Sequence, residues 1–192
     1  MTLNGIVALL WVLFLGAWLV LARFTKRRAR SGAGSPAVIV RLILAALLLA
    51  YLALERGGGD HGLRLYLARG LVPQLSVRVL GLAFCLCGFA LAVWARLILA
   101  RNWGPPMSLR VGHELVTRGP YARVRHPIYS GLLLAALGSS LAQSALWLAL
   151  FVLMFAYFLY SARVEERLMC DLFPSDYPPY RRRTRMLIPF VL

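Results

Sequence analysis

Long apolar runs, separated by short basic or glycine-rich stretches, dominate the sequence. Residues 1–22 carry no charged side chain, residues 37–54 carry only Arg41, and residues 79–95 are again uncharged. A helix rises about 1.5 Å per residue and a hydrocarbon layer is about 30 Å thick, so each run can cross a membrane once flanking residues reach the interface. The pattern predicts membrane-spanning helices over residues 1–22, 37–54 and 77–100.

The longest uncharged run lies nearer the C-terminus. Residues 127–162 contain no formal charge, and polar residues interrupt the run only at residues 138–140 and 143–144. As one helix this run would be about 54 Å long, nearly twice a bilayer crossing. It therefore predicts a tight helical hairpin, which brings the expected number of spans to about five.

The basic residues are distributed unevenly between the two sides of these spans. Of the 22 Lys and Arg residues, only Arg56, Arg64, Arg69 and Arg78 fall on the side predicted to be external, which leaves 22 − 4 = 18 at or near the other side. By the positive-inside rule, the N-terminus lies outside and residues 113–131 face the cytoplasm. The first span is expected to be retained, because its basic residues follow the apolar run instead of preceding it.

Composition supports an all-α integral membrane protein. Hydrophobic residues make up 60% of the chain and charged residues only 15%, which is too apolar for an ordinary soluble domain. The basic residues that give the net charge of +15 lie between the spans and not along one soluble face, so nucleic acid is not expected as a partner. Cys85, Cys87 and Cys170 show no zinc or disulfide spacing, and no metal site is predicted. A bacterial inner membrane is the expected location.

A polar segment, HELVTRGPYARVRHPIYSG at residues 113–131, stands directly before the hairpin. Charged residues at such a place are costly and are kept mainly where they face a cavity, a partner or a ligand. Arg125 and His126 precede Pro127 at the start of a predicted helix, where free backbone N–H groups favour a bound anion. The alternative is interfacial: Arg beside cytoplasmic headgroups and Tyr in the aromatic belt. Composition alone leaves both interpretations open.

Two adjacent acids, Glu165 and Glu166, follow the last predicted span on the same side as this segment. The positive-inside rule gives no reason for them. Salt bridges to nearby arginines are one explanation, and a carboxylate that holds a cationic or amino-bearing ligand is the other. A ligand with an ammonium, a carboxylate and an apolar or aromatic surface would suit this mixture of Glu, Arg, His and Tyr.

The order of these elements resembles the isoprenylcysteine carboxyl methyltransferase family of membrane methyltransferases. The resemblance rests on GPYARVRHPIYSG, an apolar hairpin of about 40 residues, the pair EE, then FPSDYPPYRRR and a terminal LIPF. It implies an S-adenosylmethionine (SAM) site near the cytoplasmic surface and a lipophilic methyl acceptor that enters from the bilayer. The expected reaction is carboxyl O-methylation of an isoprenylcysteine-like C-terminal carboxylate. The chain divides accordingly into a two-span region, residues 1–76, and a methyltransferase core, residues 77–192.

Individual roles are carried over by position. The resemblance implies cofactor contacts at His113, Glu114, Leu115, Val116, Tyr121, His126, Pro127, Ile128, Tyr129 and Glu165. Catalytic roles are expected for Arg125, Arg163 and Glu166. The sequence departs from the family at Ser161, where a substrate-contacting arginine is expected, and at Pro106, where the family can carry a cofactor-contacting glutamine.

Three alternatives to this function remain open. Within methyltransferases, the acceptor is instead a phospholipid or another small amphiphile. A sterol-type reductase that uses NADPH also carries a segment similar to residues 125–129. A non-enzymatic interaction protein with a basic cytoplasmic face is the third alternative, and the arginines at 181–183 and 185 suit binding to anionic lipid.

Overall fold

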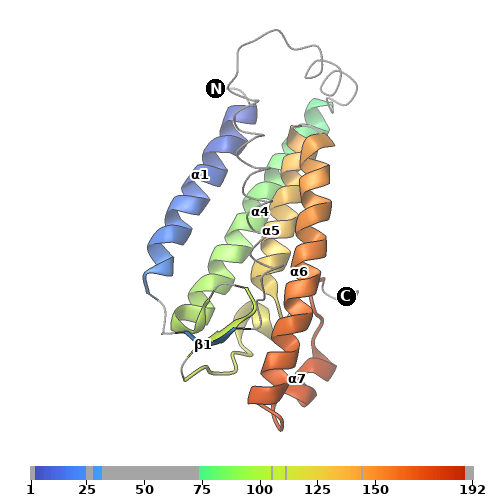
Figure 1. The fold of residues 1–192 in the computed structure, drawn as a ribbon. Helices are drawn as coiled ribbons and strands as arrows, with labels where there is room; N and C mark the ends of the chain where they lie inside the picture. Colours follow the sequence, from blue (N-terminus) through green and yellow to red (C-terminus); the bar gives the residue numbers. More distant parts are fainter. Residues whose placement is uncertain are drawn as a thin grey trace.

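A computed structural model of the protein describes residues 3–24, 28–31, 74–104, 106–110, 112–143 and 145–188. Four long helices run side by side: α1 (Leu3–Ala22), α4 (Leu75–Leu99), α5 (Pro127–Ala142) and α6 (Ala145–Leu172) (Figure 1). A short helix, α7 (Tyr177–Arg183), follows α6 and lies at one end of the bundle, which we call the α7 end. The predicted span over residues 37–54 lies outside the described residues.

The helices confirm an all-α membrane protein. Three of them are long and apolar enough to cross a bilayer, Leu3–Ala22, Leu75–Asn102 and Trp147–Leu172, while Pro127–Ala142 is shorter. The predicted hairpin is confirmed, because α5 ends at Ala142 and α6 begins at Ala145. The total of five spans stays a prediction.

Helix α6 extends further than the sequence pattern predicted. The apolar run ends at Ala162, but the helix continues to Leu172. The buried Leu168 continues its inward face, and no helix-breaking residue occurs before Pro174. Glu165 and Glu166 therefore lie on a rigid helix and not in a tail.

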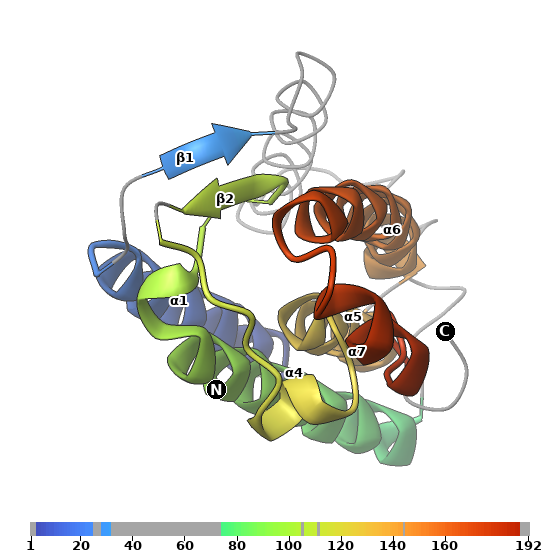
Figure 2. The ribbon, with the colours of Figure 1, turned by 90° about the horizontal axis from the view of Figure 1, so that it is seen from below.

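Short irregular elements connect the helices at the α7 end. Strand β1 (Arg28–Ser31) pairs antiparallel with β2 (Ser108–Arg110), with Arg28 opposite Arg110 and Ser31 opposite Ser108 (Figure 2). The 3₁₀ helices η1 (Ala100–Asn102) and η2 (Gly119–Ala122) lie on either side of β2 in the chain. The sequence pattern predicted neither strand. The pair ties the chain that follows α1 to the polar segment that follows α4.

Helices α4 and α5 pack with their backbones almost in contact. Gly81 and Gly88 on α4 face Gly138 and Gly131 on α5. A Cβ atom on Gly88 would lie 2.5 Å from the backbone N of Ala135 and 2.5 Å from the carbonyl O of Gly131. Small residues allow this approach between membrane helices, which fixes where α5 begins and hence where the polar segment ends.

We therefore expect Gly88→Ala to destabilise the bundle by about 1–3 kcal/mol, the usual range for overpacking. Thermal unfolding of the detergent-solubilised protein measures the effect. The matched control is Gly16→Ala on α1, where an added Cβ would have no atom within 4 Å. Equal melting temperatures for the two variants would contradict the packing described.

Arginine side chains tie α1 to the bundle at both of its ends. Near the start of α4, Arg78 donates to Asn4 Oδ1 and to the carbonyl O of Ala142, both at 3.0 Å. At the other end, Arg96 donates to the carbonyl O of Leu21 at 2.5 Å. These bonds satisfy charges that would otherwise be costly beside a membrane, and they hold α1 against the α7 end.

Candidate functional site

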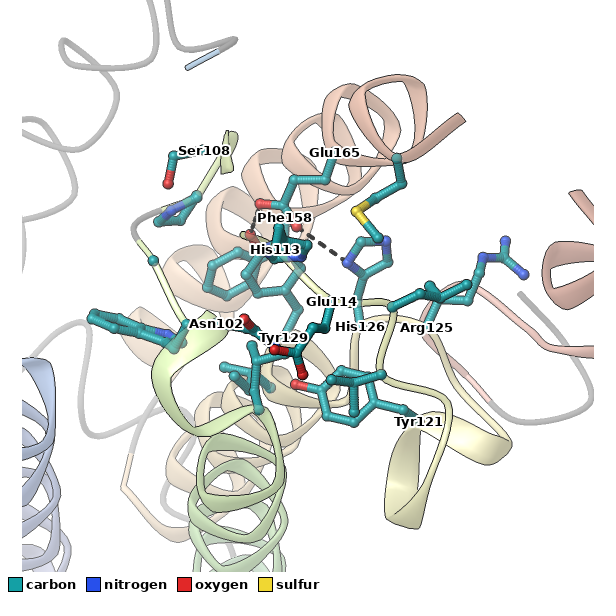
Figure 3. Close-up of a pocket in the computed structure, with 18 of the residues that line it drawn as sticks. Asn102, Ser108, His113, Glu114, Tyr121, Arg125, His126, Tyr129, Phe158 and Glu165 are labelled. Carbon is teal, nitrogen blue, oxygen red and sulfur yellow. Dashed lines mark hydrogen bonds and ion pairs between the residues drawn. The ribbon is translucent and has the colours of Figure 1, made fainter. Parts of the chain in front are cut away.

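A cavity lies at the α7 end, where α4 ends, α5 begins and α6 passes alongside α5 (Figure 3). Its volume is about 210 Å³, below the roughly 300–1,000 Å³ usual for small-molecule sites. Its walls come from α1, the segment after α4, residues 113–116, the start of α5, α6 and α7.

The structure brings most of the predicted site residues to this cavity. Nine of the ten expected cofactor residues line it, as does Arg125. The nine are His113, Glu114, Leu115, Val116, Tyr121, His126, Ile128, Tyr129 and Glu165. The tenth, Pro127, is buried at the first position of α5 and lies outside the lining.

Two of the residues expected to be catalytic lie elsewhere. Arg163 and Glu166 line a separate hollow on the other side of α6. Side chains two positions apart on a helix point about 200° apart, so Arg163 faces away when Glu165 faces the cavity. Arg163 is exposed, whereas Glu166 is buried. The structure thus gives Glu166 a supporting position and does not bring Arg163 to the cavity.

Several lining residues were not singled out from the sequence. They are Trp18, Leu99, Asn102, Trp103, Gly104, Ser108, Leu132, Phe158, Met169, Tyr177 and Tyr180. Pro106, noted above as a departure from the family, also lines the cavity. The break after α4 marked residues 102–106 as irregular, and the run DYPPY marked the two tyrosines. Trp18 carries no such signal, because it lies in a uniformly apolar span.

Glu165 is held firmly at the cavity wall. Its Oε1 accepts hydrogen bonds from the Tyr129 hydroxyl at 2.5 Å and from the backbone N–H of Met107 at 2.7 Å. Met107 is fully buried and has φ +61°, a left-handed conformation that costs free energy for a non-glycine residue. Met107 adopts this conformation at the point where its backbone N–H donates to the Glu165 carboxylate. With Oε1 occupied by two donors, Oε2 is the oxygen with more remaining capacity for a ligand.

Glu166, one position along α6, forms a buried ion pair with Arg125. The Arg125 Nε lies 2.7 Å from Glu166 Oε1, and the two side chains are only 8% and 5% exposed. Arg125 Nη1 also donates to the carbonyl O atoms of Arg181 and Thr184. The salt-bridge explanation of the acidic pair thus holds for Glu166, which ties α6 to the polar segment and to α7.

The C-terminal segment reinforces this arrangement through the backbone. The N–H of Arg125 donates to the carbonyl O of Arg185 at 2.8 Å, and the N–H of His126 donates to that of Met186 at 3.1 Å. Leu187 is fully buried in the core next to these residues. Residues 185–187 therefore fix the position of Arg125 and His126 at the start of α5.

His126 lies between the two carboxylates. Its Nδ1 is 3.4 Å from Glu165 Oε2, and its Nε2 is 3.7 Å from Glu166 Oε1. Its ring lies nearly parallel to that of Tyr129, with centroids 5.5 Å apart. Burial alone would lower the pKa of His126, but the two glutamates favour the charged ring and raise its pKa above the ordinary value. The raised pKa favours the protonated form of the imidazole, which lies between the two acids.

This pKa shift predicts how stability depends on pH. Because the pKa of His126 is raised in the folded protein, its contribution is complete below the unfolded value of about 6.5 and is lost as pH rises through the folded value. We expect the melting temperature of the wild type to fall as pH rises above about 6.5. His126→Gln should remove this decline, and a decline of the same size in both proteins would contradict the assignment.

The tyrosines at the cavity remain neutral phenols near neutral pH. Burial raises the pKa of Tyr180 to about 12 and raises that of Tyr121 further. The Tyr180 hydroxyl donates to the carbonyl O of Tyr121 at 2.7 Å. Tyr129 stacks on Phe158 with centroids 4.5 Å apart. The cavity thus combines fixed carboxylates and a cationic ring with flat aromatic faces.

Comparison with known proteins agrees with this chemistry. Residues 76–176, more than half of the chain, match the family described as phospholipid methyltransferase. The chain belongs to this family. The matched region contains α4, the polar segment, α5 and α6, and therefore most of the cavity wall.

Individual relatives confirm the resemblance to isoprenylcysteine methyltransferases. The chain is 29% identical over 126 residues to protein-S-isoprenylcysteine O-methyltransferase B of Arabidopsis thaliana, covering 64% of each chain. It also matches the solved structure of a eukaryotic intramembrane Ras methyltransferase, with TM-score 0.55 and 27% identity over 60% of this chain and 43% of that one.

A relative with a different description is also similar. The cobalt-zinc-cadmium resistance protein CzcN of Cupriavidus metallidurans is 32% identical over 157 residues, which cover 79% of this chain and 61% of that protein. The chain thus spans about three-fifths of the length of the curated relatives it matches. Within the described part of the chain, no group of three or more His, Cys, Asp or Glu side chains is placed to hold a metal ion.

Proposed function

We propose that this protein is a SAM-dependent methyltransferase that acts on a lipophilic acceptor, most specifically on an isoprenylcysteine-like C-terminal carboxylate. The observation that carries the proposal is the cavity around Glu165, which collects nine of the ten residues expected to contact the cofactor. It lies within the region that matches the phospholipid methyltransferase family. The positive-inside pattern supports a cytoplasmic cavity in a bacterial inner membrane.

The residues present fit SAM. Oε2 of Glu165 and the carboxylate of Glu114 suit the ammonium group of its methionine part, and the charged ring of His126 suits its carboxylate. The faces of Tyr121 and Tyr129 suit the sulfonium, with a cation–π attraction of about 0.5–2 kcal/mol. When bound, this cofactor supplies an electrophilic methyl group attached to the sulfonium.

The contribution of the protein is mainly alignment and exclusion of water. In-line displacement needs the acceptor oxygen, the methyl carbon and the sulfur on one axis, and rigid positioning of such reactants can lower a barrier by several kcal/mol. Glu165 is held by Tyr129 and Met107, so the charged wall of the cavity is rigid. Arg125 adds positive charge that complements a carboxylate acceptor. Such an acceptor is already an anion and needs no general base.

Methylation of a phospholipid amine is the second candidate, and the description of the matched family favours it. An ammonium acceptor must lose a proton before it can act as a nucleophile. Glu165 Oε2, which lies 3.4 Å from His126 Nδ1, is a carboxylate oxygen that can accept that proton. A carboxylate acceptor therefore needs no general base, whereas an amine acceptor needs one of these residues to take its proton.

Transfer of a radiolabelled methyl group tests the function. The purified wild type is incubated with methyl-labelled SAM and either N-acetyl-S-farnesylcysteine or vesicles that contain phosphatidylethanolamine. We expect label in the farnesyl product that alkaline hydrolysis releases as volatile methanol, because the product is an ester. Label that resists hydrolysis in the phospholipid would instead support N-methylation. No transfer to either acceptor by folded protein would contradict the proposed function.

A further inference from the structure

The two ends of the cavity differ in chemistry. One end carries the charged side chains Glu165, His126 and Arg125. The other end, where α4 meets α1, includes Trp18, Leu99 and Trp103, together with a polar side chain. That side chain is Asn102, which Figure 3 shows across the cavity from Arg125.

Asn102 is buried without its hydrogen bond. The residue is only 6% exposed, and its Oδ1 has no partner in the described part of the chain. A buried polar atom left unpaired costs about 1–3 kcal/mol, and native structures contain few such atoms. An unpaired oxygen in the wall of a ligand cavity therefore indicates that a ligand supplies the missing donor.

The local backbone is built to hold Asn102 in this place. Helix α4 ends at Leu99, and the next residue, Ala100, has a φ of +49° that is unfavourable for a residue with a Cβ. Arg96 Nη1 donates to the carbonyl O of Ala100 at 2.7 Å, and the Arg96 guanidinium lies 4.7 Å from the ring centroid of Trp103. The turn at Ala100 and the contacts of Arg96 fix the positions of Asn102 and Trp103. The side chain of Asn102 is therefore held in one orientation.

The side chains around Asn102 suit a ligand that combines an uncharged hydrogen-bond donor with an apolar chain. The rings of Trp18 and Trp103 pack edge to face at 5.6 Å and form an apolar corner beside α1. The ammonium and carboxylate of a cofactor have charged partners in the cavity at Glu165 and His126. The adenosine of the cofactor carries uncharged donors as well, but the ligand whose long apolar chain matches Trp18, Leu99 and Trp103 is the methyl acceptor.

We propose that Asn102 Oδ1 accepts a hydrogen bond from a neutral N–H or O–H group of the methyl acceptor, while Trp18, Leu99 and Trp103 hold its apolar chain. This inference rests on the proposed function and narrows its substrate class. The acceptor then carries an uncharged donor near the methylated group, and Asn102 is a specificity-determining residue for it.

A matched pair of acceptors tests this role. N-acetyl-S-farnesylcysteine and S-farnesylthiopropionic acid share the farnesyl thioether and the carboxylate, but only the first has an amide N–H. Because the second leaves Asn102 unpaired, we expect wild-type kcat/KM to favour the first by about tenfold or more. Asn102→Leu, which keeps the branched shape and the number of heavy atoms, should reduce this preference to less than about twofold, and its SAM Kd should change by less than about twofold.

The outcomes separate this inference from the function on which it rests. A preference that survives in Asn102→Leu overturns the inference, as does a wild type without any preference. A SAM Kd that rises at least about tenfold in the variant assigns Asn102 to the cofactor and also overturns it. Transfer to phosphatidylethanolamine alone overturns it, because that donor is a charged ammonium. If the wild type binds no SAM and methylates none of these acceptors, the proposed function itself fails. Asn102→Ala, assayed identically, replaces the leucine variant if the latter does not fold.

Discussion

Glu165→Gln is expected to weaken SAM binding by about 10-fold to 100-fold and to lower methyl transfer at least as much. A hydrogen bond to a charged group is worth about 1.5–3 kcal/mol, and the variant loses the charge that faces the cofactor ammonium. Glutamine keeps an oxygen that can accept from Met107 N–H and the Tyr129 hydroxyl, the two bonds that fix the native side chain. Equilibrium binding and initial rates measure both effects.

The matched control for Glu165→Gln is Asp171→Asn. Asp171 lies on the same helix, is exposed and borders the hollow on the other side of α6. Its replacement should change SAM affinity by less than about twofold, since interactions between exposed charges are weak. Equal losses in the two variants would mean that overall charge, and not the position of Glu165, controls binding.

Arg125→Met is expected to lower the free energy of unfolding by about 3–5 kcal/mol, the usual cost of breaking a buried ion pair from one side. The Glu166 side chain, 5% exposed, would lose the guanidinium 2.7 Å away. Its remaining charged neighbours are Arg181, with Nε at 3.4 Å, and His126. The carbonyl O of Thr184 would also lose a donor. Denaturant or thermal unfolding in detergent measures the change.

The double variant Arg125→Met/Glu166→Leu separates charge from packing. Replacing both partners removes the uncompensated carboxylate, so we expect it to recover a large part of the stability lost in the single variant. Arg182→Met, at an exposed position of α7, is the control and should change stability by less than about 0.5 kcal/mol. A single variant as stable as this control would contradict the structural role of Arg125.

The sequence predicts the parts of this protein that depend on strong, local signals. The hairpin follows from an uncharged run too long for one crossing, broken by Gln143 and Ser144. The polar side chains next to a membrane span mark residues 113–131 as a site, and the family resemblance implies the cavity residues at 113–116, 126, 128 and 129. In both cases the cost of burying charge or exposing apolar surface leaves few alternatives.

The features that the sequence does not predict depend on contacts between distant segments. Trp18 reaches the cavity because Arg96 holds the end of α1 at Leu21. The strand pair forms between residues 28–31 and 108–110, far apart in the chain. Glu165 lines the cavity and Glu166 pairs with Arg125. They differ because α6 continues through both residues, and adjacent side chains on a helix point about 100° apart. Arg163, for which a catalytic role is expected from the resemblance, lies two positions from Glu165 on α6 and borders the other hollow.

The central claim is that the cavity around Glu165 binds SAM. Isothermal titration of the purified, detergent-solubilised wild type with SAM, and separately with NADPH, tests it most directly. The account predicts saturable binding of one SAM per chain and no measurable binding of NADPH. Binding of NADPH alone would contradict it in favour of a reductase, and binding of neither by correctly folded protein would leave the cavity without its proposed ligand and contradict the account as a whole.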